Sequence, residues 1–168
     1  MVETMVVNPI VRKRLEAQGF GNLNDAEVDE LAPWLRWSPL ICTLFMVAGI
    51  VLESPAVLWS LAATAFLGAV LPFHPFDLLY NYGARHLTGT GPLPHHGPPR
   101  RFACAMATVW LIGTGWAFHA GAPAVGYLLG VPLILVAALV SSTHICIPSI
   151  IYNRLFTSRR TAHAQSDI

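Results

Sequence analysis

The positions of arginine and lysine relative to the apolar stretches constrain the fold of this chain more than any other feature. Four apolar stretches can be marked, at 38–53, 55–73, 102–122 and 124–152, and all 10 Lys and Arg residues lie outside them. The two short connections, within the first pair of stretches and within the last pair, carry no basic residue. If each stretch spans a bilayer, every basic residue falls on one side, which the positive-inside rule identifies as cytoplasmic.

The composition also indicates a membrane protein. Hydrophobic residues make up 54% of the chain and charged residues only 11%, whereas soluble domains average roughly 25% charged residues. A helix that crosses a bilayer needs about 20 apolar residues, with about 17 as the lower limit. The last two stretches satisfy this easily, the second fits, and the first is marginal. We therefore predict an all-α integral membrane protein with four transmembrane helices; a re-entrant hairpin in place of the first two is the alternative.

This pattern predicts three regions. Residues 1–37 form a cytoplasmic or interfacial N-terminal segment, 38–152 form the membrane domain, and 153–168 form a cytoplasmic tail. The membrane domain includes a long cytoplasmic loop, 74–101, between the second and third helices. We expect a multi-pass protein of the bacterial inner membrane with both termini in the cytoplasm.

An amphipathic helix is predicted before the first apolar stretch. Asn24 and Glu27 have the spacing of a capping box, and apolar residues recur on one face from Ala26 onward. Trp34 and Trp37 are expected at the level of the lipid head groups. The segment is either a lead-in along the membrane surface, which we favour, or a docking surface for a partner. Further candidate interface residues, expected against partner helices or pigments, are Trp110 and Trp116.

The loop at 74–101 has two parts of different character. A short interfacial helix is predicted to begin at Pro75, with Phe76, Leu79 and Tyr80 facing lipid. The second part is rich in Gly and Pro, a composition that resists regular structure. It contains the pair His95 and His96, which we expect in a solvated loop.

Cysteine and histidine residues near the cytoplasmic ends of the spans offer a candidate metal site. The four residues at a similar depth are His74, Cys104, His144 and Cys146, and thiolate and imidazole are zinc or haem ligands. Pro148 is expected to kink the fourth helix beside this group. The alternative, which we favour, is that the cysteines serve as small buried apolar residues.

Two histidines are candidate ligands of a larger cofactor. His119 lies near the outer end of the third helix among small residues, and His144 lies in the cytoplasmic half of the fourth. Either imidazole is a possible axial ligand for haem or for the magnesium of a (bacterio)chlorophyll. Small residues equally serve close helix packing in lipid, and we favour packing. Bound lipid is the remaining cofactor candidate.

The sequence argues against several classes of function. The spans contain no carboxylate pair, no evident Ser-His-Asp set and no phosphate-binding loop, so we do not expect an enzyme. The formal net charge of +1 gives no reason to expect nucleic acid as a partner.

Three segments resemble a known family. They are His74-Pro-Phe-Asp-Leu-Leu-Tyr, Pro98-Pro-Arg-Arg-Phe-Ala and Cys146-Ile-Pro-Ser-Ile-Ile-Tyr, and Val7-Asn-Pro-Ile-Val-Arg is similar to the usual opening of that family. The family is the bacterial membrane family known as domain of unknown function 4395. The resemblance implies a small four-helix membrane protein and no established activity. Family members commonly carry Cys-x-x-Cys in the last helix, whereas this chain has Ser149 at the second position, which argues against dithiol chemistry.

Three functions remain. The leading hypothesis is a non-catalytic accessory or structural subunit of a larger bacterial membrane complex, respiratory or photosynthetic, with lipid and other membrane subunits as partners. The second is a haem- or chlorin-binding membrane protein that uses His119 or His144. The third is a membrane protein that handles thiols or metals.

Overall fold

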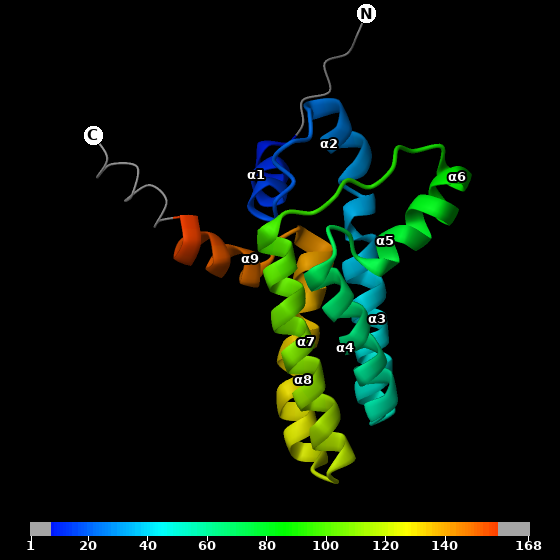
Figure 1. Cartoon of the computed structure of the whole chain (residues 1–168), viewed down its shortest axis with the longest axis vertical. Coiled ribbons are helices and arrows are strands. Elements are labelled where there is room, and N and C mark those ends of the chain that lie inside the picture. Colours follow the sequence, from blue (N-terminus) through cyan, green and yellow to red (C-terminus); the bar gives the residue numbers. More distant parts are fainter. Residues whose placement is uncertain (1–7, 158–168) are drawn as a thin grey trace, which may run out of the picture.

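The computed structural model describes residues 8–157, whose secondary-structure elements are all helices, with no strand among them. Two long helical hairpins form the body of the molecule, and the shorter helices gather at one end of it (Figure 1). The helices in chain order are α1 (Pro9–Ala17), α2 (Asp25–Leu31), η1 (Trp34–Arg36), α3 (Trp37–Val51), α4 (Pro55–Val70), α5 (Pro75–Leu79), η2 (Tyr80–Ala84), α6 (Arg85–Thr88), α7 (Pro98–His119), α8 (Pro123–Thr143), α9 (Ile147–Tyr152) and η3 (Asn153–Thr157). The outermost parts of the predicted N-terminal segment and tail, 1–7 and 158–168, lie outside the described residues.

Three helical segments are long and apolar enough to cross a membrane: Trp34–Val51, Pro98–His119 and Pro123–Thr143. A fourth crossing is counted only if α4 is joined to the helix at Pro75–Thr88, from which it is bent by 87°. The prediction of apolar helices of membrane length is therefore confirmed. The number of segments that could cross is three, against the four predicted, or four if the bent pair counts as one.

Proline residues set where the long helices begin. Pro55, Pro98 and Pro123 each lie in the first turn of a helix, where the missing N–H costs nothing and the fixed φ suits the helix. For this reason α7 begins at Pro98, four residues before the apolar stretch predicted at 102–122. The turns that close the two hairpins contain Glu53 and Gly121, both with positive φ.

The fourth apolar stretch, predicted as one kinked helix over 124–152, is two separate helices. α8 ends at Thr143, and His144 takes up a left-handed conformation with φ of 59° before α9 begins at Ile147. Pro148 explains the break, because its ring clashes with the carbonyl four residues earlier and it has no N–H to donate. That carbonyl belongs to His144, so the chain leaves the helix there and starts again.

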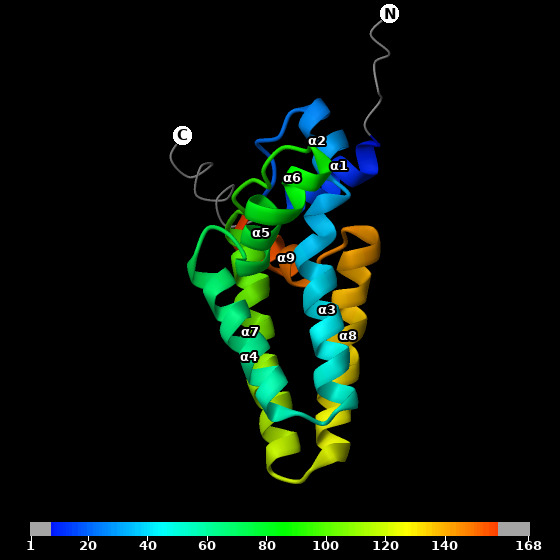
Figure 2. The same ribbon diagram turned by 90° about the vertical axis from the view of Figure 1, so that its right-hand side faces the viewer.

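The four long helices form a ring in which each contacts two others. Figure 2 shows α4 beside α7 and α3 beside α8, and the two hairpins also meet where α7 packs on α8 and α3 on α4. The core between them is built from apolar side chains, among them Met46, Leu58, Leu61, Leu111 and Leu133. The short elements α1, η1, α6 and η3 and the first turn of α7, which carry the basic residues of the described chain, lie at the end away from the two hairpin turns (Figure 1).

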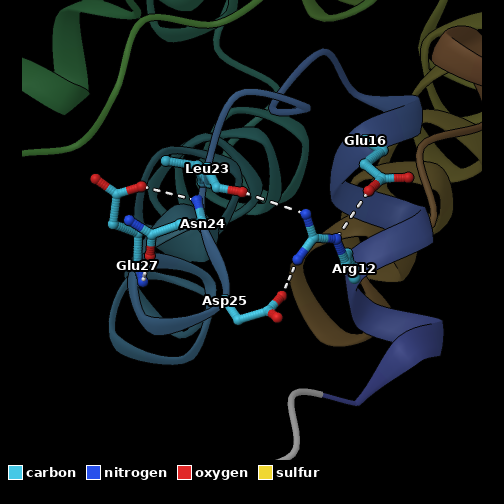
Figure 3. A network of polar contacts seen from close by, with 6 residues as sticks. All are labelled: Arg12, Glu16, Leu23, Asn24, Asp25 and Glu27. Atoms are coloured by element: carbon cyan, nitrogen blue, oxygen red, sulfur yellow. Dashed lines mark hydrogen bonds and ion pairs between the residues drawn. The ribbon is translucent and has the colours of Figure 1, made fainter.

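A second, smaller core lies at that end, where α1, α2 and the segment after α5 pack together around Leu15, Phe20, Val28 and Leu93. α1 has no counterpart among the predicted helices. Arg12 of α1 joins it to α2, since its guanidinium forms ion pairs with Glu16 and Asp25 and contacts the carbonyl of Leu23 at 3.5 Å (Figure 3).

The capping box predicted at the start of α2 is confirmed. The Asn24 side chain accepts from the Glu27 N–H at 2.9 Å, and the Glu27 carboxylate accepts from the Asn24 N–H at 2.9 Å (Figure 3). These reciprocal bonds satisfy two N–H groups that a helix start otherwise leaves unpaired.

Two predictions for the loop at 74–101 are wrong in part. The helix at Pro75 forms, but Tyr80 is fully buried and does not face lipid: its ring packs against Trp34 and Trp37, and its hydroxyl contacts Thr90. His96 is also buried and not solvated. In both cases the loop folds back onto the body of the molecule. Tyr80 and Leu93 belong to the second core, and His96 bonds to the carbonyls of Gly68 and Pro72 near the end of α4.

Candidate functional site

A cavity of about 350 Å³ lies inside the helix ring, towards the end that carries the short helices. Its walls come from α3, α4, α7, α8 and α9, and most of the lining is aliphatic, as with Met46, Leu61 and Leu133. Cavities that hold small ligands are mostly apolar with a few placed polar groups, and their volumes begin at about 300 Å³. The polar and sulfur-containing lining residues are Gln18, Ser38, His74, Arg100, two methionines and the three cysteines, and Trp110 contributes an aromatic ring.

All three cysteines of the chain line this one cavity. Cys42 comes from α3, Cys104 from α7, and Cys146 from the turn between α8 and α9. Each is a free thiol with partial burial. The fold thus gathers residues that lie as far apart in the sequence as Cys42 and Cys146.

His74 occupies a fixed position at the edge of the cavity. It caps the N-terminus of α5, where its ring Nδ1 accepts the backbone N–H of Phe76 at 3.3 Å. Its backbone N–H donates to the Asp77 carboxylate at 3.1 Å. Because Nδ1 accepts a hydrogen bond, the ring proton lies on Nε2. That nitrogen lies 3.8 Å from the Cys42 sulfur, so the imidazole turns its N–H towards the thiol.

Gly68 makes room for this arrangement. A Cβ at this position would lie 2.7 Å from Cδ2 of His74 and 3.3 Å from the sulfur of Cys104. The hydrogen of Gly68 therefore allows α4 to lie against both the histidine and α7.

Arg100 is the most unusual residue of the cavity, since it is a buried cation with an exposed fraction of only 6%. Its guanidinium lies over the Phe20 ring, 5.2 Å from the ring centre. Within residues 8–157 the side chain forms neither a hydrogen bond nor an ion pair. The next residue behaves differently: the exposed Arg101 donates to the carbonyls of Ala69 and Val70, at 2.9 and 2.7 Å, and so caps α4.

His96 lies near Arg100 but does not line the cavity. Its ring Nε2 donates to the carbonyl of Gly68 at 3.0 Å, and its backbone N–H donates to the carbonyl of Pro72 at 3.0 Å. These two bonds fix the loop to the end of α4. Nδ1 is buried without a partner among the described residues. Burial, with the added effect of the Arg100 charge, lowers the pKa of His96 from 6.5 to about 4. The imidazole is therefore neutral at physiological pH.

Residues 29–156 match the family described as a domain of unknown function, DUF4395. The chain belongs to this family. No curated protein and no solved structure matches it. The resemblance inferred from the short motifs is thus confirmed over most of the chain.

The structure of this DUF4395 protein brings together three of the four predicted metal ligands and leaves one apart. His74, Cys104 and Cys146 line the cavity, whereas His144 lies outside it. Among the described residues no group of three or more His, Cys, Asp and Glu side chains is arranged to hold a metal. His144 is separated because the left-handed turn at the end of α8 directs it towards Arg36, whose Nε donates to its Nε2 at 2.8 Å.

The other predicted site residues lie at scattered positions. The His119 ring packs between Trp59 and Trp116, at 5.4 and 5.8 Å between ring centres. Trp110 lines the cavity and donates from its indole N–H to the carbonyl of Leu129 at 2.9 Å. Trp34 and Trp37, predicted at the membrane interface, both pack on Tyr80.

Arg100 was not among the site residues predicted from the sequence, and Ser149 of the DUF4395 protein was considered only as the position of a missing cysteine. Ser149 is fully buried, and its hydroxyl donates to the carbonyl of Pro99 at 3.2 Å, which ties α9 to the first turn of α7. One feature of the sequence could have indicated that Arg100 is buried. Two adjacent arginines at the start of an apolar helix point about 100° apart, so they cannot both take the same route to solvent.

Proposed function

We propose that this protein is a membrane protein without catalytic activity that holds a small amphiphilic molecule inside its helix bundle. The observation that carries the proposal is the cavity of about 350 Å³, which combines an apolar body with a few polar groups at one end. Cavities lined by apolar groups bind apolar molecules readily, because the molecule leaves water and gains close contacts.

The proposal includes the topology. Four crossings, with α4 as the second and α5 to α6 along the membrane surface, place all the basic residues in the cytoplasm, which supports cytoplasmic termini and a location in the bacterial inner membrane. Reporter fusions at the two ends and at the hairpin turns test this. A reporter active on the outer side when fused at either terminus would overturn the topology.

A cavity-filling substitution tests the binding function. Ala107 lines the cavity, whereas Ala105, on the same helix, is exposed on the outside. Native mass spectrometry of the protein extracted from its own membrane should show a bound small molecule. Ala107→Phe should remove this added mass and Ala105→Phe should retain it. A protein that carries no added mass in any form would overturn the proposal.

A second candidate is the accessory subunit of a larger respiratory or photosynthetic membrane complex. The outer surface of α8 supports it: only 17% of its apolar segment is buried inside the chain, against 33% for α7. Leu128 and Leu135 stand out from this helix with most of their surface uncovered. Partner helices or lipid would cover this face. Copurification in equal amounts with a larger assembly is expected, and isolation as a lone monomer would count against it.

The two remaining hypotheses differ in their support. For haem or chlorin binding, His144 would first have to give up the hydrogen bond from Arg36, and His119 would have to separate from two tryptophan rings. For thiol handling, the gathering of Cys42, Cys104 and Cys146 at one cavity is the supporting observation. Metal handling lacks a ligand set within residues 8–157.

A further inference from the structure

Arg100 has no anionic partner among the described residues, although it is buried and permanently charged. A guanidinium does not lose its proton in proteins, and an isolated buried charge is costly unless an opposite charge or hydrogen-bond acceptors surround it. The contact with the Phe20 ring offsets only part of this cost, because cation–π contacts contribute about 0.5–2 kcal/mol.

The one buried acid among residues 8–157, Asp77, is engaged elsewhere. The Asp77 carboxylate accepts hydrogen bonds from the Ser38 hydroxyl and from the N–H of His74, and it forms no ion pair with Arg100. Gln18 directs its amide N–H to the carbonyl of His144 at 2.8 Å. Neither residue supplies the charge that Arg100 lacks.

Arg100 lines the cavity at its polar end. Gln18, Ser38 and His74 line the cavity with it, while the rest of the wall is apolar. The cavity therefore has a cationic end and a hydrocarbon-like body. A molecule that complements both parts has an anionic head and an apolar chain.

The shape of arginine and the size of the cavity narrow the ligand class. A guanidinium offers two parallel N–H groups that match the oxygens of a carboxylate or a phosphate. A volume of about 350 Å³ lies near the lower end of the range for small-ligand sites, about 300–1,000 Å³, which favours one chain over two. We propose that the cavity binds a single-chain amphiphile whose oxyanion head group pairs with Arg100. The inference rests on the proposed function and names its ligand.

The test uses the full chain in nanodiscs of phosphatidylcholine, with 12-bromododecanoate as the probe. Bromine quenches tryptophan fluorescence on contact, and Trp110 lines the cavity. Probe bound in the cavity gives a saturable decrease in fluorescence, whereas probe dissolved in the lipid gives one that does not saturate. The saturable part should disappear in Trp110→Phe.

Competition by three molecules of equal chain length identifies the head group. Dodecanoate, dodecyl phosphate and dodecanol are each added against the bound probe. At least one of the two anions should displace it about tenfold better than the alcohol, which corresponds to about 1.4 kcal/mol. The stronger of the two anions distinguishes a free carboxylate from a phosphate head group as the source.

Variants then assign the preference to Arg100. Arg100→Met should bring the anions and the alcohol to equal potency, and Arg100→Lys should keep a reduced preference for the anions. Arg85→Gln removes a charge outside the cavity and should change nothing. Because the comparison of anion with alcohol needs only the unmodified protein, poor folding of Arg100→Met leaves the test intact.

Two results would overturn the inference, and they are distinguishable. Equal displacement by all three competitors in the unmodified protein would refute the anionic head group and leave the proposed binding function standing. No saturable quenching by 12-bromododecanoate, together with no displacement of any native ligand by dodecanol, would refute both.

Discussion

The imidazole Nε2 of His74 lies 3.8 Å from the sulfur of Cys42, and this contact connects the start of α5 to the second turn of α3 at the edge of the cavity. The ring cannot turn freely, because its Nδ1 accepts the N–H of Phe76. Gly68 lies against its other side. The position of His74 therefore depends on the absence of a side chain at residue 68.

Gly68→Ala is expected to destabilise the protein. The new methyl group would lie 2.7 Å from the His74 ring, and overpacking of this kind typically costs about 1–3 kcal/mol. Thermal unfolding in mild detergent measures the effect. Gly113→Ala is the matched control, since nothing lies within 4 Å of its Cβ and alanine is the better helix former by up to about 1 kcal/mol. Equal unfolding temperatures for the two variants would contradict the prediction.

The rate at which the three cysteines are chemically modified should show whether the cavity is occupied. A small apolar reagent such as methyl methanethiosulfonate is expected to modify Cys42, Cys104 and Cys146 in the empty protein, as all three line the cavity. Bound dodecanoate should slow the modification several-fold, because it occupies the same space. Mass spectrometry of the labelled protein measures the rates. A cysteine introduced by Ala105→Cys on the outer face is the control; slowing of that thiol by the same factor would show a general effect of the fatty acid.

Much of the helical architecture could be predicted, because it depends on local rules. Apolar length indicated the long helices, and the spacing of Asn24 and Glu27 predicted the cap of α2. The break at His144 was predicted only as a kink, since a proline shows that a helix is disturbed and does not show how far the chain turns. These features follow from single segments of the chain.

The site could not be assembled from the sequence for a different reason. The burial of Arg100 and His96 depends on the loop at 74–101 folding back onto the body of the molecule, and nothing in the loop's own composition indicates this. The gathering of three cysteines likewise depends on which helices are neighbours in the ring, which apolar periodicity does not reveal because lipid-facing and partner-facing surfaces are both apolar.

Substitutions of the adjacent residues Arg100 and Arg101 should have different effects on the stability of the ligand-free protein. Arg101→Gln removes two hydrogen bonds to the last carbonyls of α4 and should lower the free energy of unfolding by about 1 kcal/mol, the usual contribution of such bonds. Arg100→Met replaces a buried, unpaired charge by an apolar side chain of similar length, so stability should be unchanged or higher. Chemical denaturation of delipidated protein in detergent measures both. A larger loss for Arg100→Met than for Arg101→Gln would show that Arg100 has a structural partner.

Stability should fall as the pH is lowered from about 6.5 towards 4. Burial lowers the pKa of His96 from 6.5 to about 4. Burial does the same for the pKa of His74, with the added effect of the Arg100 charge, and for that of His144, with the added effect of the Arg36 charge. Between these values the unfolded chain binds protons that the folded chain does not. The stabilisation is therefore complete above the unfolded pKa and is lost as the pH falls through the folded pKa. Because a tenfold change in proton affinity corresponds to about 1.4 kcal/mol, His96 contributes at most about 3 kcal/mol across this range.

His96→Gln tests the contribution of this residue to the pH dependence. The glutamine amide can donate to the carbonyl of Gly68 in place of Nε2, so stability at pH 8 should change little. It does not titrate, so the decrease between pH 6.5 and 4 should shrink by roughly a third, with His74 and His144 supplying the remainder. His95→Gln, at an exposed position, should leave the pH profile unchanged. Urea denaturation at several pH values gives the profile, and an undiminished decrease in His96→Gln would show that His96 does not stay neutral in the folded protein.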